Sequence, residues 1–268
     1  MKDYPLVNIC IPTCNVEKTI KKTLLSILNQ TYKNFMVHII DNNSNDKTIS
    51  IIKSFKNKKI KLFKYKKRVV AEENFNRCIK LAKGKYTAIY HSDDIYDSQI
   101  VYKQVCFLEK NKNTGAVFSE GNLIDQNNNF ISTAEAPLSV KNDNFNYSYE
   151  QIFEELTVNY NFLLCPTAMV RTSIYKNEIK RFRHHFFGNS SDLDVWLRIA
   201  KNYPIGIIKQ KLINYRISST QQTAVTRNDS ALPNFFKVMD HYIQDTKIKN
   251  KKKIKKNYNI LKTYIYLF

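Results

Sequence analysis

Alternating hydrophobic patterns in the first 120 positions constrain the fold of this chain most strongly. Short apolar runs typical of buried strands alternate with stretches whose apolar residues recur every three or four positions, as in amphipathic helices. The predicted strands are 6–11, 35–40, 60–63, 86–90 and 116–119, and the predicted helices are 17–28, 47–55, 72–82 and 98–108. This alternation is typical of an α/β protein in which crossover helices cover a mostly parallel sheet. Pro12 is expected to end the first strand, and Asp46 is expected to cap the second helix.

The second half of the chain has a less regular pattern. Residues 121–146 are polar and rich in asparagine, which predicts a loop or a hairpin. Helices are predicted at 149–156 and 192–200, short strands at 204–208 and 212–215, and a basic helical segment from 232 onward. The chain therefore divides into an α/β domain over residues 1–225 and a basic helical C-terminal extension over 226–268.

The net charge of the chain is strongly positive. The sequence holds 43 basic and 23 acidic residues, a formal charge of +20. Lysine supplies most of the excess, and a diffuse solvated surface is the simplest interpretation. From Lys247 to the end, however, the chain carries eight lysines and no acidic residue. Such a block favours anionic partners such as membrane phospholipid, whereas the chain carries no recognised nucleic-acid motif and we expect no nucleic-acid partner.

Cysteine usage and the lack of long apolar runs bear on the compartment. The five cysteines form no CxxC pair, so buried thiols in a reducing compartment are expected rather than disulfides or a zinc site. The N-terminus does not resemble a signal peptide. No stretch approaches the roughly 18 apolar residues that a membrane span needs. We therefore expect a cytoplasmic protein, with a peripheral position on the inner face of the cell membrane as the alternative.

Polar clusters follow three of the predicted strands. They are residues 13–15, 41–46 and 91–94. In an open α/β sheet, ligands bind beyond the carboxyl ends of the strands, so these clusters should line one crevice. Each cluster could also form only a turn or a helix cap. The adjacent carboxylates of Asp93 and Asp94 repel each other unless a cation relieves them, and carboxylates suit Mg²⁺ or Mn²⁺.

The chain has only five glycines and neither a GxGxxG nor a P-loop motif, so a nucleotide must be bound in another way. In its polar clusters and their order along the chain, the sequence resembles the family 2 glycosyltransferases of the GT-A fold. The resemblance extends from position 7 to about position 223. It rests on a Pro-Thr-X-Asn loop at 12–15, an Asn-Gln-Thr-Tyr turn at 29–32, an acidic and asparagine-rich segment at 41–46, an Asn-containing helix at 73–77, an Ala-X-Gly-X-Tyr strand entry at 82–86, and residues 91–94 in the place of an Asp-X-Asp motif.

Two downstream segments extend the resemblance. Residues 192–198 are similar to a Glu-Asp-X-X-X-Trp-X-Arg stretch, in which the family's Asp is the general base, and residues 215–216 are similar to a closing Tyr-Arg pair. Asp192 could instead cap the helix that it begins. Trp196 is expected to be a core side chain rather than a site residue.

The resemblance implies a set of site residues. Asp192 is the expected catalytic base, Asp93 and His91 are the expected metal ligands, and Asp41 is expected to contact the base of the nucleotide. Asp93 is also an expected donor-binding residue. The others are Pro12, Thr13, Asn15, Glu17, Asn43, Asn74, Asn76, Ser92 and Asp94. Arg198, Tyr215 and Arg216 are further possible site residues. The implied cofactor is Mn²⁺ or Mg²⁺.

Three positions depart from the family pattern. His91 stands where the first Asp of the metal motif is usual, Ser191 replaces the Glu before the expected base, and Ser218 lies where a His often follows the Tyr-Arg pair. These departures concern how tightly the metal is held. One carboxylate nevertheless remains for each essential role.

The function implied is that of a metal-dependent, inverting hexosyl- or N-acetylhexosaminyl-transferase. It would move a sugar from a nucleotide-sugar, expected to be a UDP-sugar, to a hydroxyl of a glycan or polyprenyl-linked acceptor in surface polysaccharide synthesis. The GT-A domain would then have a donor half over about 1–120 and an acceptor half over about 121–225. Two alternatives remain open: a nucleotidyltransferase on a related sheet, and a basic nucleic-acid- or membrane-binding protein without catalysis.

Overall fold

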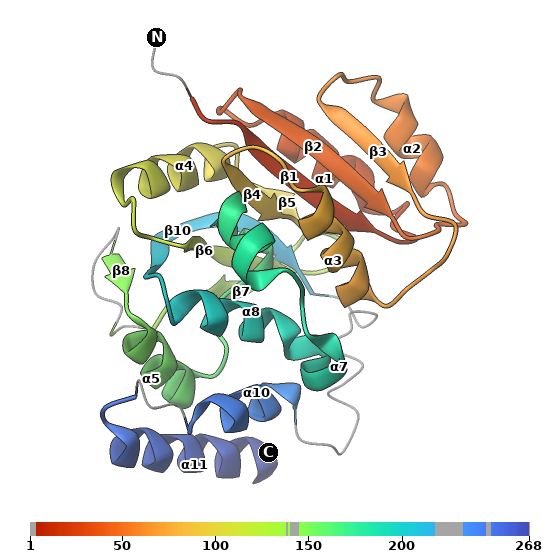
Figure 1. The fold of residues 1–268 in the computed structure, drawn as a ribbon. Coiled ribbons are helices and arrows are strands. Elements are labelled where there is room, and N and C mark those ends of the chain that lie inside the picture. The colour runs from red at the N-terminus through yellow and green to blue at the C-terminus, as the bar shows by residue number, and fades with distance from the viewer. Residues whose placement is uncertain (1–3, 138, 140–144, 218–232, 245–247, 268) are drawn as a thin grey trace.

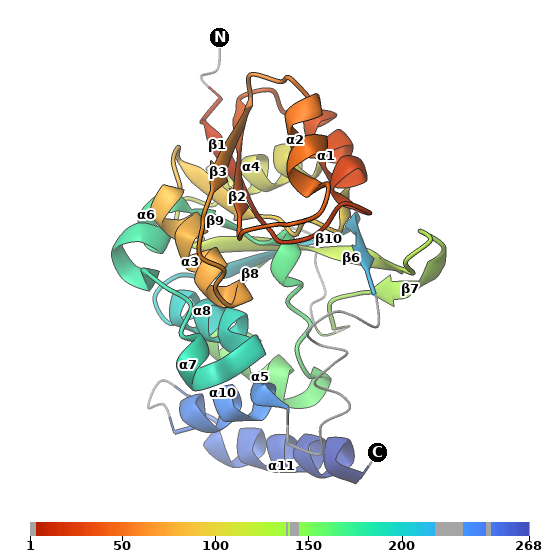
Figure 2. The ribbon, with the colours of Figure 1, turned by 90° about the vertical axis from the view of Figure 1, so that its right-hand side faces the viewer.

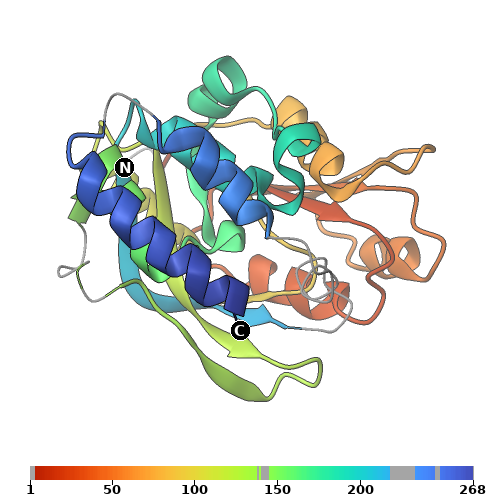
Figure 3. The same ribbon diagram turned by 90° about the horizontal axis from the view of Figure 1, so that it is seen from below.

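The structure is a computed structural model that describes residues 4–137, 139, 145–217, 233–244 and 248–267. A twisted sheet occupies the centre of the molecule, with helices packed on both of its faces (Figures 1 and 2). A pair of helices from the C-terminal segment lies across one end, as the view from below shows (Figure 3).

Ten strands among the described residues form one mixed sheet. Its first half is parallel, in the order β3 (Ile60–Lys64), β2 (Phe35–Asp41), β1 (Val7–Thr13) and β4 (Tyr86–Ile89). The short β9 (Met169–Arg171) then runs antiparallel between β4 and β6 (Ala116–Ile124). Next comes β10 (Ile205–Arg216), parallel to β6, and β5 (Ile95–Tyr96) forms the edge. Two further strands, β7 (Phe130–Ala134) and β8 (Phe145–Tyr147), pair with β6 and β10.

Helices cover the two faces of the sheet through separate hydrophobic clusters. On one face, α1 (Ile20–Leu28), α2 (Thr48–Ser54) and α4 (Ile100–Lys110) contribute apolar side chains to the first cluster. On the other, α3 (Ala71–Leu81), α5 (Tyr149–Asn159) and α8 (Ser191–Ala200) contribute to the second. Trp196 lies in this second cluster and is almost fully buried, as expected. The α/β class, the mixed sheet and the flanking helices are thus confirmed.

Short helical turns connect the larger elements of the second half. They are η1 (Cys165–Thr167), α6 (Thr172–Ile174), the π-helical η2 (Tyr175–Ile179), α7 (His184–Phe187) and η3 (Gly188–Ser190). The start of α5 is secured by a capping box, in which Ser148 and Gln151 exchange side-chain-to-backbone hydrogen bonds.

The structure corrects two of the predicted boundaries. The first strand continues through Pro12 to Thr13 instead of ending at Pro12. The last backbone bond from this edge of β1 to β4 goes from the Tyr90 N–H to the Cys10 carbonyl. Pro12 faces the same side two residues later, where β4 has already ended, so the missing N–H costs no ladder bond. The two strands predicted at 204–208 and 212–215 are one strand, β10, interrupted only by two register shifts against β6.

The polar segment after position 120 begins in regular structure. β6 runs to Ile124 and pairs with β7 as an antiparallel hairpin, one of the two predicted outcomes. α1 begins at Ile20, three residues later than predicted. Lys47 rather than Asp46 occupies the N-cap position of α2, although the Asp46 carboxylate, one residue earlier, accepts the Thr48 N–H at 2.9 Å.

The C-terminal segment forms α10 (Asn234–Tyr242) and α11 (Lys251–Leu267), as its pattern predicts. The apolar stripe of α11 faces inward: Ile254 and Tyr258 are buried in the same hydrophobic cluster as α5 and α8. Asp240 joins the two helices, since it accepts the Tyr258 hydroxyl at 2.6 Å and the Lys262 ammonium at 3.0 Å. The predicted boundary at 225 and Ser218 lie outside the described residues. Within the described part of the chain, no helix combines the length and hydropathy that crossing a bilayer requires.

Candidate active site

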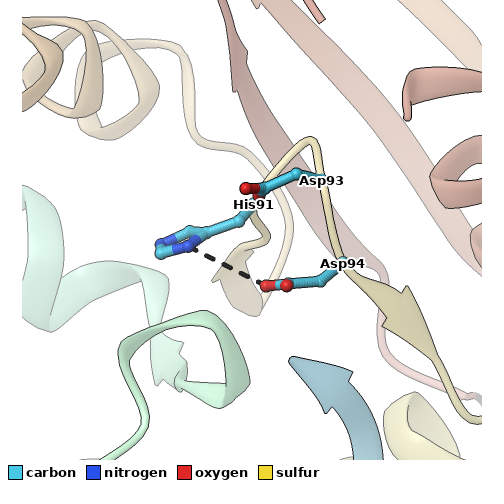
Figure 4. Close-up of side chains that lie close together, drawn as sticks. All are labelled: His91, Asp93 and Asp94. Atoms are coloured by element: carbon cyan, nitrogen blue, oxygen red, sulfur yellow. Dashed lines mark ion pairs between the residues drawn. The ribbon is translucent and has the colours of Figure 1, made fainter. Parts of the chain in front are cut away.

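The loop after β4 brings together the three side chains predicted around the metal. One ligand atom each of His91, Asp93 and Asp94 can be chosen so that all lie within 4.8 Å of one another. Figure 4 shows the His91 ring and the Asp94 carboxylate facing each other, with 3.9 Å between Nδ1 and Oδ2. Asp94 is fully buried and His91 is partly exposed. This cluster lies beyond the carboxyl end of a parallel strand, where open α/β sheets bind ligands.

The residues of this cluster fit a divalent cation. Neither His91 Nε2 nor Asp94 Oδ2 makes a hydrogen bond to the residues that the structure describes, although both atoms are buried. Burial, reinforced by the charge of Asp93, raises the pKa of Asp94 well above its usual value, and burial lowers the pKa of His91. A bound cation would offset the cost of burying these carboxylates. Two carboxylates and one imidazole are a donor set that Mn²⁺ or Mg²⁺ accepts when substrate oxygens complete the coordination.

Arg216 holds the expected metal loop, residues 91–94, in place from the end of β10. Its backbone N–H donates to Asp94 Oδ1 at 2.8 Å, and its Nε donates to the Asp93 carbonyl at 2.8 Å. Its two remaining guanidinium nitrogens donate to the Asp125 carbonyl and to Asn128 Oδ1, at 2.7 and 2.8 Å. Arg216 therefore links the metal loop to the β6–β7 turn. Because its donors are occupied in this way, Arg216 acts on the site by positioning the loop.

Two threonines, Thr19 at the N-cap of α1 and Thr23 within it, support the same loop from the other side. The Thr19 hydroxyl donates to the Ser92 carbonyl at 3.1 Å, and the Thr23 hydroxyl shares its one proton between the Asp94 carbonyl at 2.7 Å and the Ser92 carbonyl at 3.1 Å. The Ser92 side chain is nearly buried. The backbone of residues 92–94 is thus anchored on both sides, which leaves their side chains to form the site.

The loops after β1 and β2 are joined by reciprocal hydrogen bonds. The Asn15 N–H donates to Ser44 Oγ at 2.9 Å. The Glu17 N–H donates to Asp46 Oδ2 at 3.1 Å, and Glu17 Oε2 in turn accepts the Lys47 N–H at 2.9 Å. Asn15 and Glu17 therefore join these two loops at the expected donor crevice, and their contact with a donor stays a prediction.

Asp41 ends β2 at the centre of this crevice. Its carboxylate is buried and accepts the Ser44 hydroxyl at 2.6 Å and the Ser44 N–H at 3.1 Å. Thr13 lies opposite Asp41 in the β1–β2 register, one position after Pro12. Asn43 adopts a positive φ of 62°, which asparagine tolerates better than most residues. The predicted nucleotide-binding residues Pro12, Thr13 and Asp41 thus lie together at the carboxyl ends of adjacent strands.

The two asparagines of α3 bind the backbone of neighbouring elements. Asn74 Nδ2 donates to the Ile40 carbonyl at 2.9 Å, so it fixes α3 against the end of β2. Asn76 Oδ1 accepts the Phe182 N–H at 2.6 Å, so it fixes α3 against the segment before α7. Both residues are buried. Their predicted contact with the donor is untested, whereas their bonds here define the wall of the crevice.

Asp192 lies in the first turn of α8, where Ser190 rather than Asp192 occupies the N-cap position. Burial raises the pKa of Asp192 to about 6, and hydrogen bonds from the backbone N–H groups of Leu193 and Asp192 and then from the Cys165 thiol moderate this rise in pKa. The Cys165 thiol is also close enough to Asp94 for their charges to interact. The Tyr215 hydroxyl likewise feels the charges of Asp93, Asp94 and Asp192, and these add to the burial that raises its pKa. The expected base and the acidic cluster are therefore close enough for both to act on Cys165 and Tyr215.

Cys165 was not predicted as a site residue. The sequence places it in an apolar run before β9, where a buried thiol is the ordinary interpretation. Cys165 and Asp192 are 27 positions apart in the chain and meet only in the folded protein, and no local pattern in the sequence signals this contact. A motif search centred on carboxylates and histidine could not have found it.

Arg198 lies on the far side of α8 and supports the structure. Its Nε donates to Asp194 Oδ2 at 3.1 Å, and its two terminal nitrogens donate to the carbonyls of Ile179 and Arg181, at 2.8 and 2.6 Å. Arg183 also binds Asp194 through two nitrogens. These bonds attach α8 to the segment that precedes α7. Arg198 thus orients the helix that carries Asp192.

A parallel half-sheet with a metal-compatible acidic cluster beyond its strands, a half-buried carboxylate at the start of α8 and helices on both faces defines the architecture of a GT-A glycosyltransferase. Comparison with known proteins agrees with this class. The profile described as Glycosyl transferase family 2 matches residues 8–178, and the chain belongs to that family.

Curated relatives cover nearly the whole chain. An uncharacterised glycosyltransferase of Methanocaldococcus jannaschii is 30% identical over 272 residues, which span 98% of this chain and 87% of that protein. The UDP-Glc:alpha-D-GlcNAc-diphosphoundecaprenol beta-1,3-glucosyltransferase WfgD of Escherichia coli is 27% identical over 230 residues, 85% of this chain and 82% of the relative. The protein is accordingly a glycosyltransferase.

Solved structures share the fold at low sequence identity. Residues 1–349 of TarS from S. aureus, in complex with UDP-GlcNAc, superpose with a TM-score of 0.72 and 17% identity, covering 94% of this chain and 71% of that one. The mannosyltransferase PcManGT of Pyrobaculum calidifontis, in complex with GDP-Man and Mn²⁺, has a TM-score of 0.70 and 15% identity, covering 99% and 73%. These similarities confirm the GT-A fold.

Proposed function

We propose that the chain is a metal-dependent, inverting glycosyltransferase that uses a UDP-sugar. The observation that carries this proposal is the proximity of two groups, since the charges of both act on Cys165 and Tyr215. One is the His91–Asp93–Asp94 cluster after β4, and the other is the half-buried Asp192 carboxyl, with a pKa of about 6. A transfer reaction from a nucleotide-sugar needs both a counter-charge for the leaving diphosphate and a base for the acceptor hydroxyl.

The metal site would be formed by Asp93 and His91, with Asp94 beside them. A Mn²⁺ or Mg²⁺ ion bound there supplies Lewis-acid neutralisation of the negative charge on the diphosphate. Arg216 and the α1 threonines keep the loop backbone fixed, so the ligand side chains are held before the donor arrives. Preorganisation of this kind lowers the cost of reaching the transition state.

Asp192 would act as the general base. With a pKa of about 6 it is mostly ionised at neutral pH, yet it is basic enough to accept a proton efficiently. It would take the proton from the acceptor hydroxyl as that oxygen attacks the anomeric carbon from the face opposite the leaving group. One such displacement inverts the anomeric configuration.

The donor nucleotide would occupy the crevice lined by Thr13 and Asp41, with Asp41 contacting the base and Asn76 at the far wall. Names of similar proteins support a UDP-sugar: WfgD is a UDP-Glc transferase and TarS was solved with UDP-GlcNAc. Because PcManGT was solved with GDP-Man, the test below also includes other nucleotide-sugars. We infer a hexosyl or N-acetylhexosaminyl group as the transferred sugar.

The acceptor half of residues 121–225 would bind a glycan or a polyprenyl-linked sugar used in surface polysaccharide synthesis. The name of WfgD, which acts on a diphosphoundecaprenol-linked sugar, supports this class. Such an acceptor would place the enzyme in the cytoplasm, peripherally on the inner face of the membrane. The apolar side chains of Ile254 and Tyr258 on α11 are buried in the core, so a membrane contact would use the exposed lysines of its outer face.

A nucleotide-sugar screen tests this proposal. Hydrolysis and thermal stabilisation would be measured with UDP-, GDP- and other nucleotide-sugars, with and without Mn²⁺. We expect one UDP-sugar to stabilise the protein against heat and to be hydrolysed slowly by it. Both effects should require the metal. Equal behaviour in EDTA would contradict the metal role, and a preference for a GDP-sugar would contradict the UDP assignment.

A further inference from the structure

A second concave surface lies away from the donor crevice, between α7 and α10. It encloses about 500 Å³ and is lined by Arg183, Phe186, Phe187, Lys237, Asp240 and His241. None of these residues belongs to the predicted donor or metal site. Figure 1 shows α7 between α3 and α10, on the side of the molecule where the parallel strands end.

The walls of this α7–α10 pocket are partly aromatic. Phe187 is buried and packs against the Arg183 guanidinium at 5.2 Å and against the His241 ring at 5.4 Å. Phe186, by contrast, is 69% exposed. A large aromatic side chain exposed at the rim of a pocket is typical of a binding surface, because it offers apolar area that nothing in the fold uses.

The charge of the pocket is positive. The Asp240 carboxylate is already neutralised by the Lys262 ammonium and hydrogen-bonded to the Tyr258 hydroxyl. Asp194 is shared between Arg183 and Arg198, which leaves one guanidinium charge in excess. Lys237 adds a further exposed cation. The pocket therefore complements an anion that carries an apolar group.

The packing of α10 fixes the position of the pocket relative to the expected base. Gly188 has a φ of +52°, and a Cβ there would lie 2.4 Å from Asn234 Nδ2 at the start of α10. Asn234 also donates to Asn189 Oδ1 at 2.9 Å. Because η3 leads directly into α8, Phe187 is only five residues before Asp192 in the chain. The pocket is thus rigidly attached to the helix that carries Asp192.

We propose that the α7–α10 pocket binds the phosphate or diphosphate group of an amphiphilic acceptor. Lys237 and Arg183 face the phosphate oxygens, and Phe186 contacts the apolar chain next to them. This assignment rests on the proposed glycosyltransferase function, in which the acceptor hydroxyl must reach Asp192. Anchoring the acceptor by its charged group would leave its sugar free to extend toward the crevice.

The test is a calorimetric titration of the full chain with geranyl diphosphate in EDTA, where the donor site lacks its metal. We expect saturable binding by the unmodified protein and at least a 10-fold loss of affinity in Lys237→Glu and in Phe186→Ser. Both side chains are exposed, so neither change should disturb folding. Lys252→Glu is the matched control: it makes the same charge change on the exposed outer face of α11 and should bind within 2-fold of the unmodified protein.

Further titrations separate the contributions of the apolar chain and the diphosphate, and phosphatidylglycerol vesicles test a lipid headgroup as the source of the phosphate. Geraniol should bind weakly and inorganic pyrophosphate with intermediate affinity, because each supplies half of the ligand. No saturable binding by the unmodified protein, or an equal loss in Lys252→Glu, would overturn the proposal. It would also be overturned if Lys237→Glu reduced binding to phosphatidylglycerol vesicles but not to geranyl diphosphate. Hydrolysis of the donor without acceptor should be the same in Lys237→Glu, so a failure of the glycosyltransferase assignment would be seen separately.

Discussion

Asp194 is the fully buried carboxylate that joins three helical segments, and its replacement by asparagine should destabilise the protein strongly. It accepts Arg183 Nε at 3.0 Å together with Arg183 Nη2, Arg198 Nε at 3.1 Å, and the Tyr242 hydroxyl at 2.7 Å. These partners belong to the segment before α7, to α8 and to α10. Asparagine keeps the shape of the side chain but removes its charge and one acceptor.

The magnitude follows from the charges left behind. Removing one partner of a buried ion pair costs about 3–5 kcal/mol, because the remaining charge is uncompensated. In Asp194→Asn two guanidinium groups lose their common counter-ion, so we expect a loss at the upper end of that range. For a chain of this size the loss corresponds to a fall in Tm of roughly 10 °C or more. Tyr242→Phe removes only one hydrogen bond to a charged group and should cost about 1.5–3 kcal/mol.

Urea unfolding followed by the fluorescence of Trp196 measures both variants. Trp196 is the single tryptophan and lies on α8, the helix that carries Asp194. The midpoint should fall further for Asp194→Asn than for Tyr242→Phe, with an unchanged slope. A loss below about 1 kcal/mol in Asp194→Asn, or an equal loss in the two variants, would refute the idea that this carboxylate holds the helices together by its charge.

Four further predictions concern the site and the tail. Asp93→Asn should lower turnover by at least about 100-fold while leaving Tm within a few degrees, and near-normal turnover at low Mn²⁺ would exclude Asp93 as a ligand. Asp192→Asn should lower kcat by about 10²–10⁴-fold with little change in donor affinity. Because Asp192 must be ionised to act as a base and its pKa is about 6, kcat of the unmodified enzyme should fall as the pH drops below about 6. If kcat of the variant falls at the same acidic pH, that pKa belongs to another group. Asp41→Ala should raise the donor KM more than it lowers kcat, and an unchanged KM would leave Asp41 with only its turn-forming bonds to Ser44. Lys252→Glu combined with Lys256→Glu should reduce co-sedimentation with anionic liposomes while preserving the fold, since both side chains are exposed; equal binding by the variant would remove the outer face of α11 as a membrane contact.

Hydrophobic periodicity in the sequence determined the N-terminal half of the fold. The strands β1 to β4 and the helices α1 to α4 lie within a few residues of their predicted positions. This succeeded because each pattern is local: a buried strand or an amphipathic helix shows its period within some ten residues. The clusters after β1, β2 and β4 were found in the same way, since parallel strands bring their carboxyl ends to one edge.

The boundaries that failed depended on neighbours that are distant in sequence. Pro12 continues β1 because β4 ends beside it, and the polar interruption at 209–210 does not split β10 because β6 pairs on both sides of it. Neither fact is visible in the residues themselves. The pairing partner, rather than local preference, decided where these strands end.

Only the tertiary structure decided which polar side chains build the site and which support it. Arg216 reaches the metal loop across 122 positions and Asn76 reaches Phe182 across 106, so their positioning roles have no local signature. Cys165 meets Asp192 only in the folded protein, because 27 positions separate the two residues in the chain. The helical spacing of Ile254, Tyr258 and Leu261 does not by itself distinguish a bilayer from a core, and the structure places Ile254 and Tyr258 in the core. A periodic pattern reports which face of an element avoids water, but the surface that covers that face is set by packing among distant segments.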